Sequence, residues 1–179
     1  MISRRRTKTL LTGTVAAVMV AMLLSACAPA VEPEPTPTAV FASEEEAFAA
    51  AEETYRAYIE AKNVERKGEP GVNSSSFLIG KALEGELASV NRRTEQGVVL
   101  AGDTRLVSFD PQESNPSATS SEVAAVVCID VTDTQILSEA GEDLTPAERA
   151  TRVALRVEFV AVDQTSMVIS NTIAEGVPC

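Results

Sequence analysis

The sequence has no histidine and no tryptophan, and aromatic residues make up only 4% of its 179 positions. Without histidine, the chain lacks the side chain that most often acts as a general base near neutral pH and as a zinc ligand. Basic residues are also few, with 15 Lys and Arg against 26 Asp and Glu, so the formal net charge is −11. Because nucleic acids are bound through clustered Lys and Arg, this balance argues against a nucleic-acid partner.

The first 26 residues have the pattern of an export signal. Three arginines and a lysine lie within residues 1–8, and an uncharged stretch follows whose residues 10–24 are mostly Leu, Val, Ala and Met. A basic start before an apolar run is typical of a signal peptide. The alternative is a transmembrane anchor, which needs about 20 apolar residues. Thr12-Gly13-Thr14 interrupts the run and leaves the apolar part short.

The next motif, Leu24-Ser25-Ala26-Cys27, looks like the lipobox of bacterial lipoproteins. This resemblance implies that Cys27 carries a thioether-linked lipid, that the chain is cleaved between Ala26 and Cys27, and that the new amino terminus is acylated. Two or more acyl chains give stable anchoring. We therefore expect a protein held by Cys27 on the extracytoplasmic face of the cell membrane, with a charge of −15 on residues 27–179.

Residues 27–40 are expected to be the lipidated cysteine and a tether rich in Pro and Glu. They hold four of the nine prolines, at Pro29, Pro33, Pro35 and Pro37. Such a segment favours an extended spacer of ~3.1 Å per residue, or a reach of roughly 40 Å. The rest of the chain, residues 41–179, has the length of one domain.

Two helices are predicted at the start of this domain. Ser43 and Glu46 form a capping box, and the apolar residues of 44–63 recur at helical spacing. A stripe of four residues predicts a second helix over 76–95, ended by Gly97 at its C-cap; these are Ile79, Leu83, Leu87 and Val90.

Strands are predicted after Gly97. Residues 105–110, 123–131 and 153–161 alternate between apolar and other side chains, and a last strand is expected over 167–174. Residues 111–121 are expected to be a polar loop. The predicted fold class is α+β, with two N-terminal helices packed on one face of a curved antiparallel sheet of three to four strands.

Cys128 and Cys179 are the cysteines that remain after Cys27. In an oxidising compartment they are expected to form a disulfide. A free thiol or a metal site is the alternative, but no other Cys or His is available as a partner.

This layout resembles the nuclear-transport-factor-2-like (cystatin-like cone) superfamily, and in particular its small lipoproteins from high-GC Gram-positive bacteria. The resemblance rests on the capped helix 43–62, the stripe 77–90, the Cys128-Ile129-Asp130-Val131 strand and Cys179. It implies a bent sheet that encloses a conical pocket with its helices. Some members use that pocket for catalysis, as in ketosteroid isomerases, whereas others are binding or accessory domains.

The sequence shows no catalytic set of residues. An isomerase-like site needs a carboxylate facing a hydroxyl donor, for which the candidates are Asp130 with Tyr55 or Tyr58. For all three, a structural role is the favoured interpretation. The acidic run 130–143 lacks the regular spacing of a calcium loop and is interpreted as a solvated loop; its members are Asp130, Asp133, Glu139, Glu142 and Asp143. Thr145-Pro146-Ala147-Glu148 is expected to form a helical turn. No metal or cofactor is predicted.

Two function hypotheses follow. The first is a non-catalytic, membrane-tethered module that binds an envelope protein or a small ligand. The second is an isomerase- or hydratase-like envelope enzyme with Asp130 as base. A transport-linked solute receptor is disfavoured, because residues 41–179 are too few for two lobes.

Overall fold

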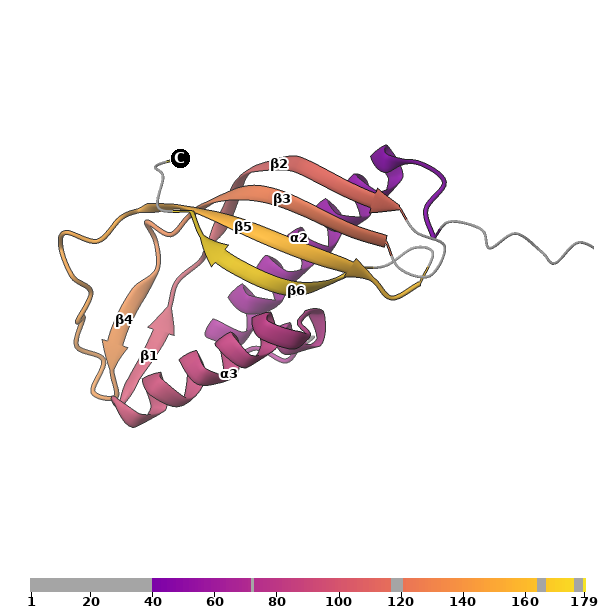
Figure 1. The fold of residues 1–179 in the computed structure, drawn as a ribbon. Coiled ribbons are helices and arrows are strands. Elements are labelled where there is room, and N and C mark those ends of the chain that lie inside the picture. The colour runs from indigo at the N-terminus through magenta and orange to yellow at the C-terminus, as the bar shows by residue number, and fades with distance from the viewer. Residues whose placement is uncertain (1–39, 72, 117–120, 164–166, 176–178) are drawn as a thin grey trace, which may run out of the picture. The chain divides into compact units, whose positions relative to one another are not determined.

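The structure is a computed structural model that describes residues 40–71, 73–116, 121–163, 167–175 and 179 (Figure 1). All of them belong to the unit Pro37–Cys179. The predicted signal peptide, the lipobox residues Leu24, Ser25 and Ala26, the lipidation site Cys27 and all of the tether except Val40 lie outside these residues.

The first predicted helix is helix α2, Glu44–Arg66, three residues longer than expected. Its capping box forms in a modified way. The Ser43 Oγ accepts from the Glu46 backbone N–H at 3.2 Å, and the Glu46 carboxylate accepts from the Ala42 backbone N–H at 2.7 Å. Three glutamates lie at the positive end of the helix dipole, and Arg66 lies in the last turn.

The second predicted helix is interrupted. Residues Ser74–Phe77 form a 3₁₀ helix, η1, and helix α3 covers Gly80–Glu95. Between them Leu78 bridges to Ile169, and the Ile79 backbone N–H donates to the Ile169 carbonyl at 2.9 Å. Gly80 then takes a φ of +52°, which reverses the chain into α3. The interruption arises because this segment pairs with a strand far away in sequence.

The main sheet has four antiparallel strands in the order β2-β3-β5-β6. These are β2 Arg105–Pro116, β3 Ser121–Asp130, β5 Arg152–Ala161 and β6 Met167–Ala174. Three predicted strands are thus found within two residues of their expected bounds. Bulges in β2 and β6 accompany the bending of the strands seen in Figure 1.

The predicted polar loop 111–121 is wrong. Residues 111–116 continue β2 and pair with β3, down to Pro116 opposite Ser121. The composition is misleading because β2 is an edge strand, where proline is tolerated and polar side chains face water.

A second sheet pairs the short strands β1 Val98–Ala101 and β4 Gln135–Ser138, which had not been predicted individually. The helical turn expected at Thr145–Glu148, after the acidic run 130–143, is present as a hydrogen-bonded turn and not as a helix. The Arg149 backbone N–H bonds to the Pro146 carbonyl at 3.2 Å, which makes a single turn.

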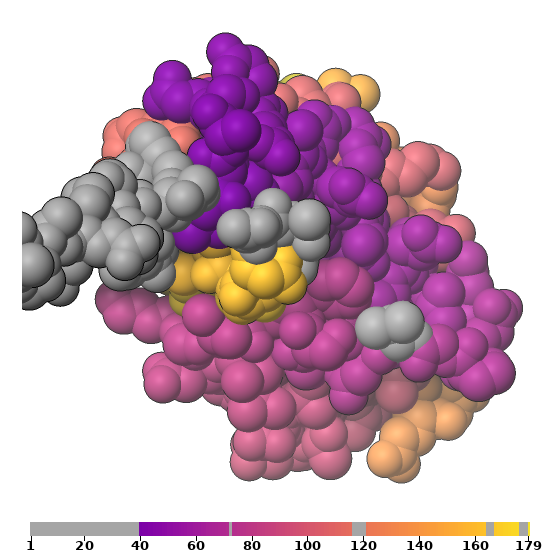
Figure 2. All heavy atoms as spheres, turned by 90° about the vertical axis from the view of Figure 1, so that its right-hand side faces the viewer, coloured from indigo at the N-terminus to yellow at the C-terminus, as the bar shows by residue number. Residues whose placement is uncertain are grey.

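The core lies between α2 and one face of the main sheet, as Figure 1 shows. Its fully buried side chains include Ala51, Val127, Val157, Phe159 and Ile169. Helix α3 lies beside β6; Figure 2 shows the yellow end of β5 and β6 between the indigo start of α2 and the magenta α3. The α+β class is confirmed, and both described α-helices precede the strands.

The predicted apolar stripe of α3 is largely exposed. Ile79, Leu87 and Val90 keep 40%, 51% and 41% of their surface accessible. Only Ala82 and Leu83 pack against the core. Helix α3 contributes a narrow contact because it lies along β6 and not across the sheet. Among the described helices, none is long and apolar enough to cross a membrane.

Candidate functional site

A cavity of about 350 Å³ lies between α2, α3 and strands β3, β5 and β6. We call it the helix–sheet pocket. Its apolar lining comes from both layers of the fold, namely Ile59, Leu78, Ala82, Ile129, Val131 and Leu155. Its polar lining comes mainly from the two helices, with Tyr55, Tyr58, Lys62, Arg66, Lys81 and Glu86. An apolar cavity with a few convergent polar groups is the usual form of a small-molecule site.

Both tyrosines of the chain line this pocket. Tyr55 is only 2% exposed and packs edge-on against Phe159, with ring centroids 6.4 Å apart. Tyr58 contacts Tyr55 and Phe77. Neither hydroxyl forms a hydrogen bond within the described residues. Burial raises the pKa of Tyr55, and burial together with the Glu86 carboxylate raises the pKa of Tyr58 to about 12. Both side chains are therefore neutral hydrogen-bond donors at physiological pH.

Among the described residues, Glu86 is the only carboxylate that lines the pocket, and two cations hold it. Its Oε1 lies 2.6 Å from Lys62 Nζ and 3.6 Å from Arg93 Nη2. The Lys62 and Glu86 side chains are only 13% and 16% exposed, so this ion pair is poorly solvated. Removing either partner of such a pair would leave a charge with little water around it.

Arg66 is held differently, by neutral oxygens. Its Nη1 donates to the Thr104 hydroxyl at 2.7 Å and more weakly to the Gly102 carbonyl at 3.4 Å. Its Nε is buried and has no hydrogen-bond partner. Burial lowers the pKa of this guanidinium, which nevertheless stays charged.

Two hydrogen bonds between Asn63 and Thr104 fix the end of α2 against the start of β2. The Asn63 amide donates to the Thr104 carbonyl and accepts from the Thr104 backbone N–H, both at 2.9 Å. Glu65 likewise holds η1, since its two oxygens accept from the Ser74 backbone and hydroxyl at 2.6 Å. Arg66 therefore lies on a helix end whose position is set by partly buried hydrogen bonds.

Gly85 lies on α3 at the rim of the pocket. A glycine inside a helix costs about 1 kcal/mol relative to alanine. A Cβ built at Gly85 meets no atom within 4 Å, so packing against a neighbour does not require this glycine. A side chain at this position would extend into the open space at the pocket rim.

Asp130, the predicted candidate base, does not line this pocket. Its neighbours Ile129 and Val131 do, and alternation along a strand places the side chain between them on the other face. The Asp130 carboxylate accepts from the Thr132 backbone N–H at 2.8 Å, and hydrogen bonds from Thr132 lower its pKa. The structure thus brings Tyr55 and Tyr58 together but does not join them with Asp130.

The acidic run 130–143 is tied into local structure. Asp133 pairs with Arg105, and Asp143 accepts from the Thr145 backbone N–H and the Gln135 amide at 2.9 Å. In the part of the chain that the structure describes, no three acidic or cysteine side chains converge as a metal site would require.

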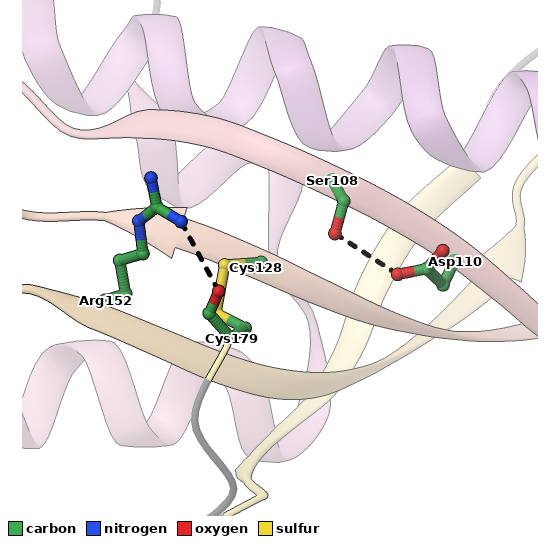
Figure 3. The surroundings of a disulfide bond; sticks show 5 residues. All are labelled: Ser108, Asp110, Cys128, Arg152 and Cys179. Carbon is green, nitrogen blue, oxygen red and sulfur yellow. Dashed lines mark hydrogen bonds between the residues drawn. A yellow bond between two sulfur atoms is a disulfide. The ribbon is translucent and has the colours of Figure 1, made fainter.

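The structure contains the Cys128–Cys179 disulfide that the sequence analysis predicts. The S–S distance is 2.06 Å and the Cα atoms lie 5.8 Å apart. Arg152 donates to the Cys179 carbonyl at 3.5 Å, and Figure 3 shows this contact beside Ser108 and Asp110 of the neighbouring strand. The bridge thus attaches the carboxyl end of the chain to strand β3, next to a cation on β5.

A larger cleft of about 750 Å³ lies at the opposite end of the sheet. Four of its lining side chains are acidic, namely Glu44, Glu113, Glu122 and Glu158. Its cation, Arg156, lies 3.5 Å from Glu113. This lining resembles the rest of an acidic surface, whereas the helix–sheet pocket concentrates cations and unpaired hydroxyls against apolar walls. We therefore regard the helix–sheet pocket as the candidate site.

The residues that sequence analysis missed are Lys62, Arg66 and Glu86. Tyr55, Tyr58, Lys62 and Arg66 are spaced by three, four and four, so basic residues continue the apolar stripe of α2. This continuation is the signal that could have identified the first two. Glu86 had no such signal, because its role depends on how α3 docks.

No protein family matches this chain, and no curated protein matches its sequence. Among solved structures, the intermembrane-space region of the chloroplast protein ARC6 is similar to part of it, with 15% identity and a TM-score of 0.46. The match covers 70% of this chain and 94% of that one. At this level of similarity we draw no conclusion from it about function.

Proposed function

We propose that this protein is a lipid-anchored, non-catalytic binding module on the extracytoplasmic face of the cell membrane, and that its ligand binds in the helix–sheet pocket. The observation that carries the proposal is the pocket lining. Apolar walls surround two tyrosine hydroxyls without hydrogen-bond partners in the described residues, beside the poorly solvated Lys62 and the half-buried Arg66.

We also propose that the domain is a cone-like member of the nuclear-transport-factor-2-like superfamily. Two features support this assignment. The helices precede an antiparallel sheet whose strands bend at bulges, and α2 lies across one face of that sheet. The pocket occupies the space that the resemblance implies, between the helices and the sheet.

The absence of catalysis is part of the proposal. The chain has no histidine, and its candidate base Asp130 lies away from both tyrosines. The carboxylate that does line the pocket, Glu86, is held in ion pairs by Lys62 and Arg93.

A pocket-blocking variant tests the binding site. In Gly85→Phe, the ring is expected to fill the pocket rim, because a Cβ at this position meets open space. The full lipidated chain in non-ionic detergent is titrated with the neutral probe cyclohexylacetamide, and its tyrosine fluorescence is recorded. Both tyrosines line the pocket and there is no tryptophan, so the emission reports on this site.

We expect a saturable change in the wild-type chain and none in Gly85→Phe. Asn91→Phe, at an exposed position of the same helix that does not line the pocket, is the matched control and should bind like the wild type. If the blocked variant responds as the wild type does, the pocket is not the binding site.

The anchor is tested by mass spectrometry of the protein isolated from membranes. The proposal predicts a chain that begins at Cys27 and carries a diacylglyceryl group and an amide-linked acyl chain. Cys27→Ser should lose all lipid and leave the membrane fraction. An intact Met1 with an unmodified Cys27 would contradict the lipoprotein assignment.

A further inference from the structure

We infer that the ligand of the helix–sheet pocket is a small organic anion, whose charged head binds Arg66 and whose apolar body lies against Ile59 and Leu155. This inference rests on the proposed function, because it names the class of ligand for the same site.

The first argument is the state of Arg66. Its hydrogen bonds go only to neutral oxygens, those of Thr104 and Gly102, and no carboxylate forms an ion pair with it in the described residues. Its Nε is buried without a partner. A partly buried guanidinium that has an unpartnered Nε and no direct ion pair is incompletely stabilised, and an anion that reached it would supply the missing hydrogen bond and ion pair.

The neighbouring cations show how unusual this is within α2. Arg56, which lies earlier in α2, donates to the Glu52 carboxylate at 2.6 Å. Lys62 shares Glu86 with Arg93, and Lys67, the helix C-cap, lies 3.0 Å from Asp103. The carboxylates of Glu86 and Asp103 act on Arg66 electrostatically, but each forms its ion pairs with other cations and none with Arg66. The geometry therefore leaves one cation of the helix end available to a ligand.

The second argument is the set of donors around Arg66. Tyr58 lies close enough for the guanidinium to affect its pKa, and the Tyr55 hydroxyl lines the same pocket. Both hydroxyls are neutral and have no partner within the described residues. A carboxylate or phosphate oxygen accepts from Arg and Tyr together and satisfies groups that a neutral or cationic ligand would leave unpaired.

The third argument is the local charge balance. Lys62, Arg66 and Lys81 line the pocket against the single carboxylate of Glu86. The excess of cations is local, because the chain as a whole has a net charge of −11. The low-dielectric walls strengthen this local positive potential. The net negative charge of the rest of the chain disfavours the binding of anions elsewhere.

The size and walls of the pocket exclude a purely inorganic anion as the full ligand. A cavity of about 350 Å³ with six apolar lining residues favours a molecule that also carries a hydrocarbon body. Carboxylates and phosphate monoesters both present two oxygens that a guanidinium can bind in a bidentate way, so the test includes both head groups.

The test compares three probes that share a cyclohexyl body by isothermal titration calorimetry on the full lipidated chain in non-ionic detergent. The probes are cyclohexylacetate, cyclohexyl phosphate and the neutral cyclohexylacetamide. We expect at least one anion to bind about tenfold or more tightly than the amide, since hydrogen bonds between charged partners are stronger than those to a neutral group. The tighter of the two anions identifies the head group.

Variants then assign the preference to Arg66. Arg66→Gln should weaken anion binding about tenfold or more and weaken amide binding much less. Arg66→Lys should recover part of the loss, because the charge returns without the planar fork. Arg56→Gln, which removes an exposed charge from the same helix, should bind all probes like the wild type. Tyr58→Phe keeps the fold and removes only one donor, so it tests the site even if Arg66→Gln unfolds.

Two results would overturn the inference. One is an amide that binds as tightly as both anions, which would retain the binding pocket but remove its anion preference. The other is an anion preference that survives in both Arg66→Gln and Tyr58→Phe, which would locate the anion elsewhere. Failure of the proposed function is separate, since it appears as probe binding that Gly85→Phe does not block.

Discussion

At the scale of single residues, two residues that line the pocket lower the stability of the fold. Arg66 keeps a buried Nε without a partner, and Gly85 keeps a glycine in the middle of a helix. Each choice costs free energy that a leucine or an alanine would recover. Residues with such a cost mark the places where the fold serves something other than its own stability.

The tyrosines predict how the protein behaves at alkaline pH. Unfolded tyrosines lose their protons near pH 10, whereas Tyr58 keeps its proton to about pH 12. Between these values the unfolded state binds fewer protons than the native state, so the free energy of unfolding should fall as the pH rises above about 10. A spectrophotometric titration should show tyrosinate forming well above pH 10 in the native chain and near pH 10 in urea. Native tyrosines that titrate near pH 10 would contradict the burial described for this pocket.

At the scale of elements, a tight turn positions the small sheet and the end of α2 beside the pocket. Gly102 joins β1 to β2 with a φ of +78°, and a Cβ at this position would come 1.9 Å from the Asp133 carbonyl oxygen. Thr104, which forms two hydrogen bonds with Asn63, lies two residues after Gly102. This turn therefore sets the distance between β2 and the end of α2.

Two glycine substitutions separate steric conflict from backbone strain. Gly68 has a φ of +68° but meets no atom within 4 Å, so Gly68→Ala should cost only about 1–2 kcal/mol of left-handed strain. Gly102→Ala adds a clash with backbone and should cost about 2 kcal/mol more. Urea unfolding of the two variants measures the difference. Equal losses would show that Gly102 has more space than the structure gives it.

Periodicity predicted much at this scale. The capped helix from Glu44 and the strands near 123–131, 153–161 and 167–174 follow from local pattern alone. The break at Leu78 does not follow from local pattern, because it depends on pairing with Ile169, which lies 91 residues further along the chain (169 − 78). The strand at 111–116 was missed because an edge strand has the composition of a loop.

The candidate site was predictable only in part. Tyr55 and Tyr58 were identified as candidates from the sequence, and they line the pocket. Asp130 was paired with them because it lies on a core strand, yet the strand turns Asp130 away while Ile129 and Val131 face the pocket. Arg66 and Glu86 come from two helices whose docking no local pattern specifies. Polar groups that meet across elements are therefore the part that needed the structure.

At the scale of the whole molecule, one covalent link ties the end of the chain to the centre of the sheet. Cys128 is 3% exposed on β3, and Cys179 is 51 residues further along the chain. The bridge restricts the unfolded chain, which in the chain-entropy treatment stabilises the fold by ~4 kcal/mol. An oxidising compartment outside the cytoplasm, as proposed here, would preserve it.

Removal of this bridge should therefore be costly. In Cys128→Ala with Cys179→Ala, the free energy of unfolding is expected to fall by ~4 kcal/mol, measured by urea denaturation. Treatment of the wild type with a reductant should lower the midpoint similarly. An unchanged midpoint in both cases would show that the disulfide is not a stabilising element.

The central claim, that the helix–sheet pocket is the ligand site, is tested most directly by NMR of the full chain in detergent with ¹³C-labelled tyrosine. Two tyrosines give two sets of signals, and both come from the pocket. The account predicts that saturating cyclohexylacetate shifts both sets in the wild type and neither in Gly85→Phe. Signals that stay unmoved in the wild type while calorimetry reports binding would contradict it.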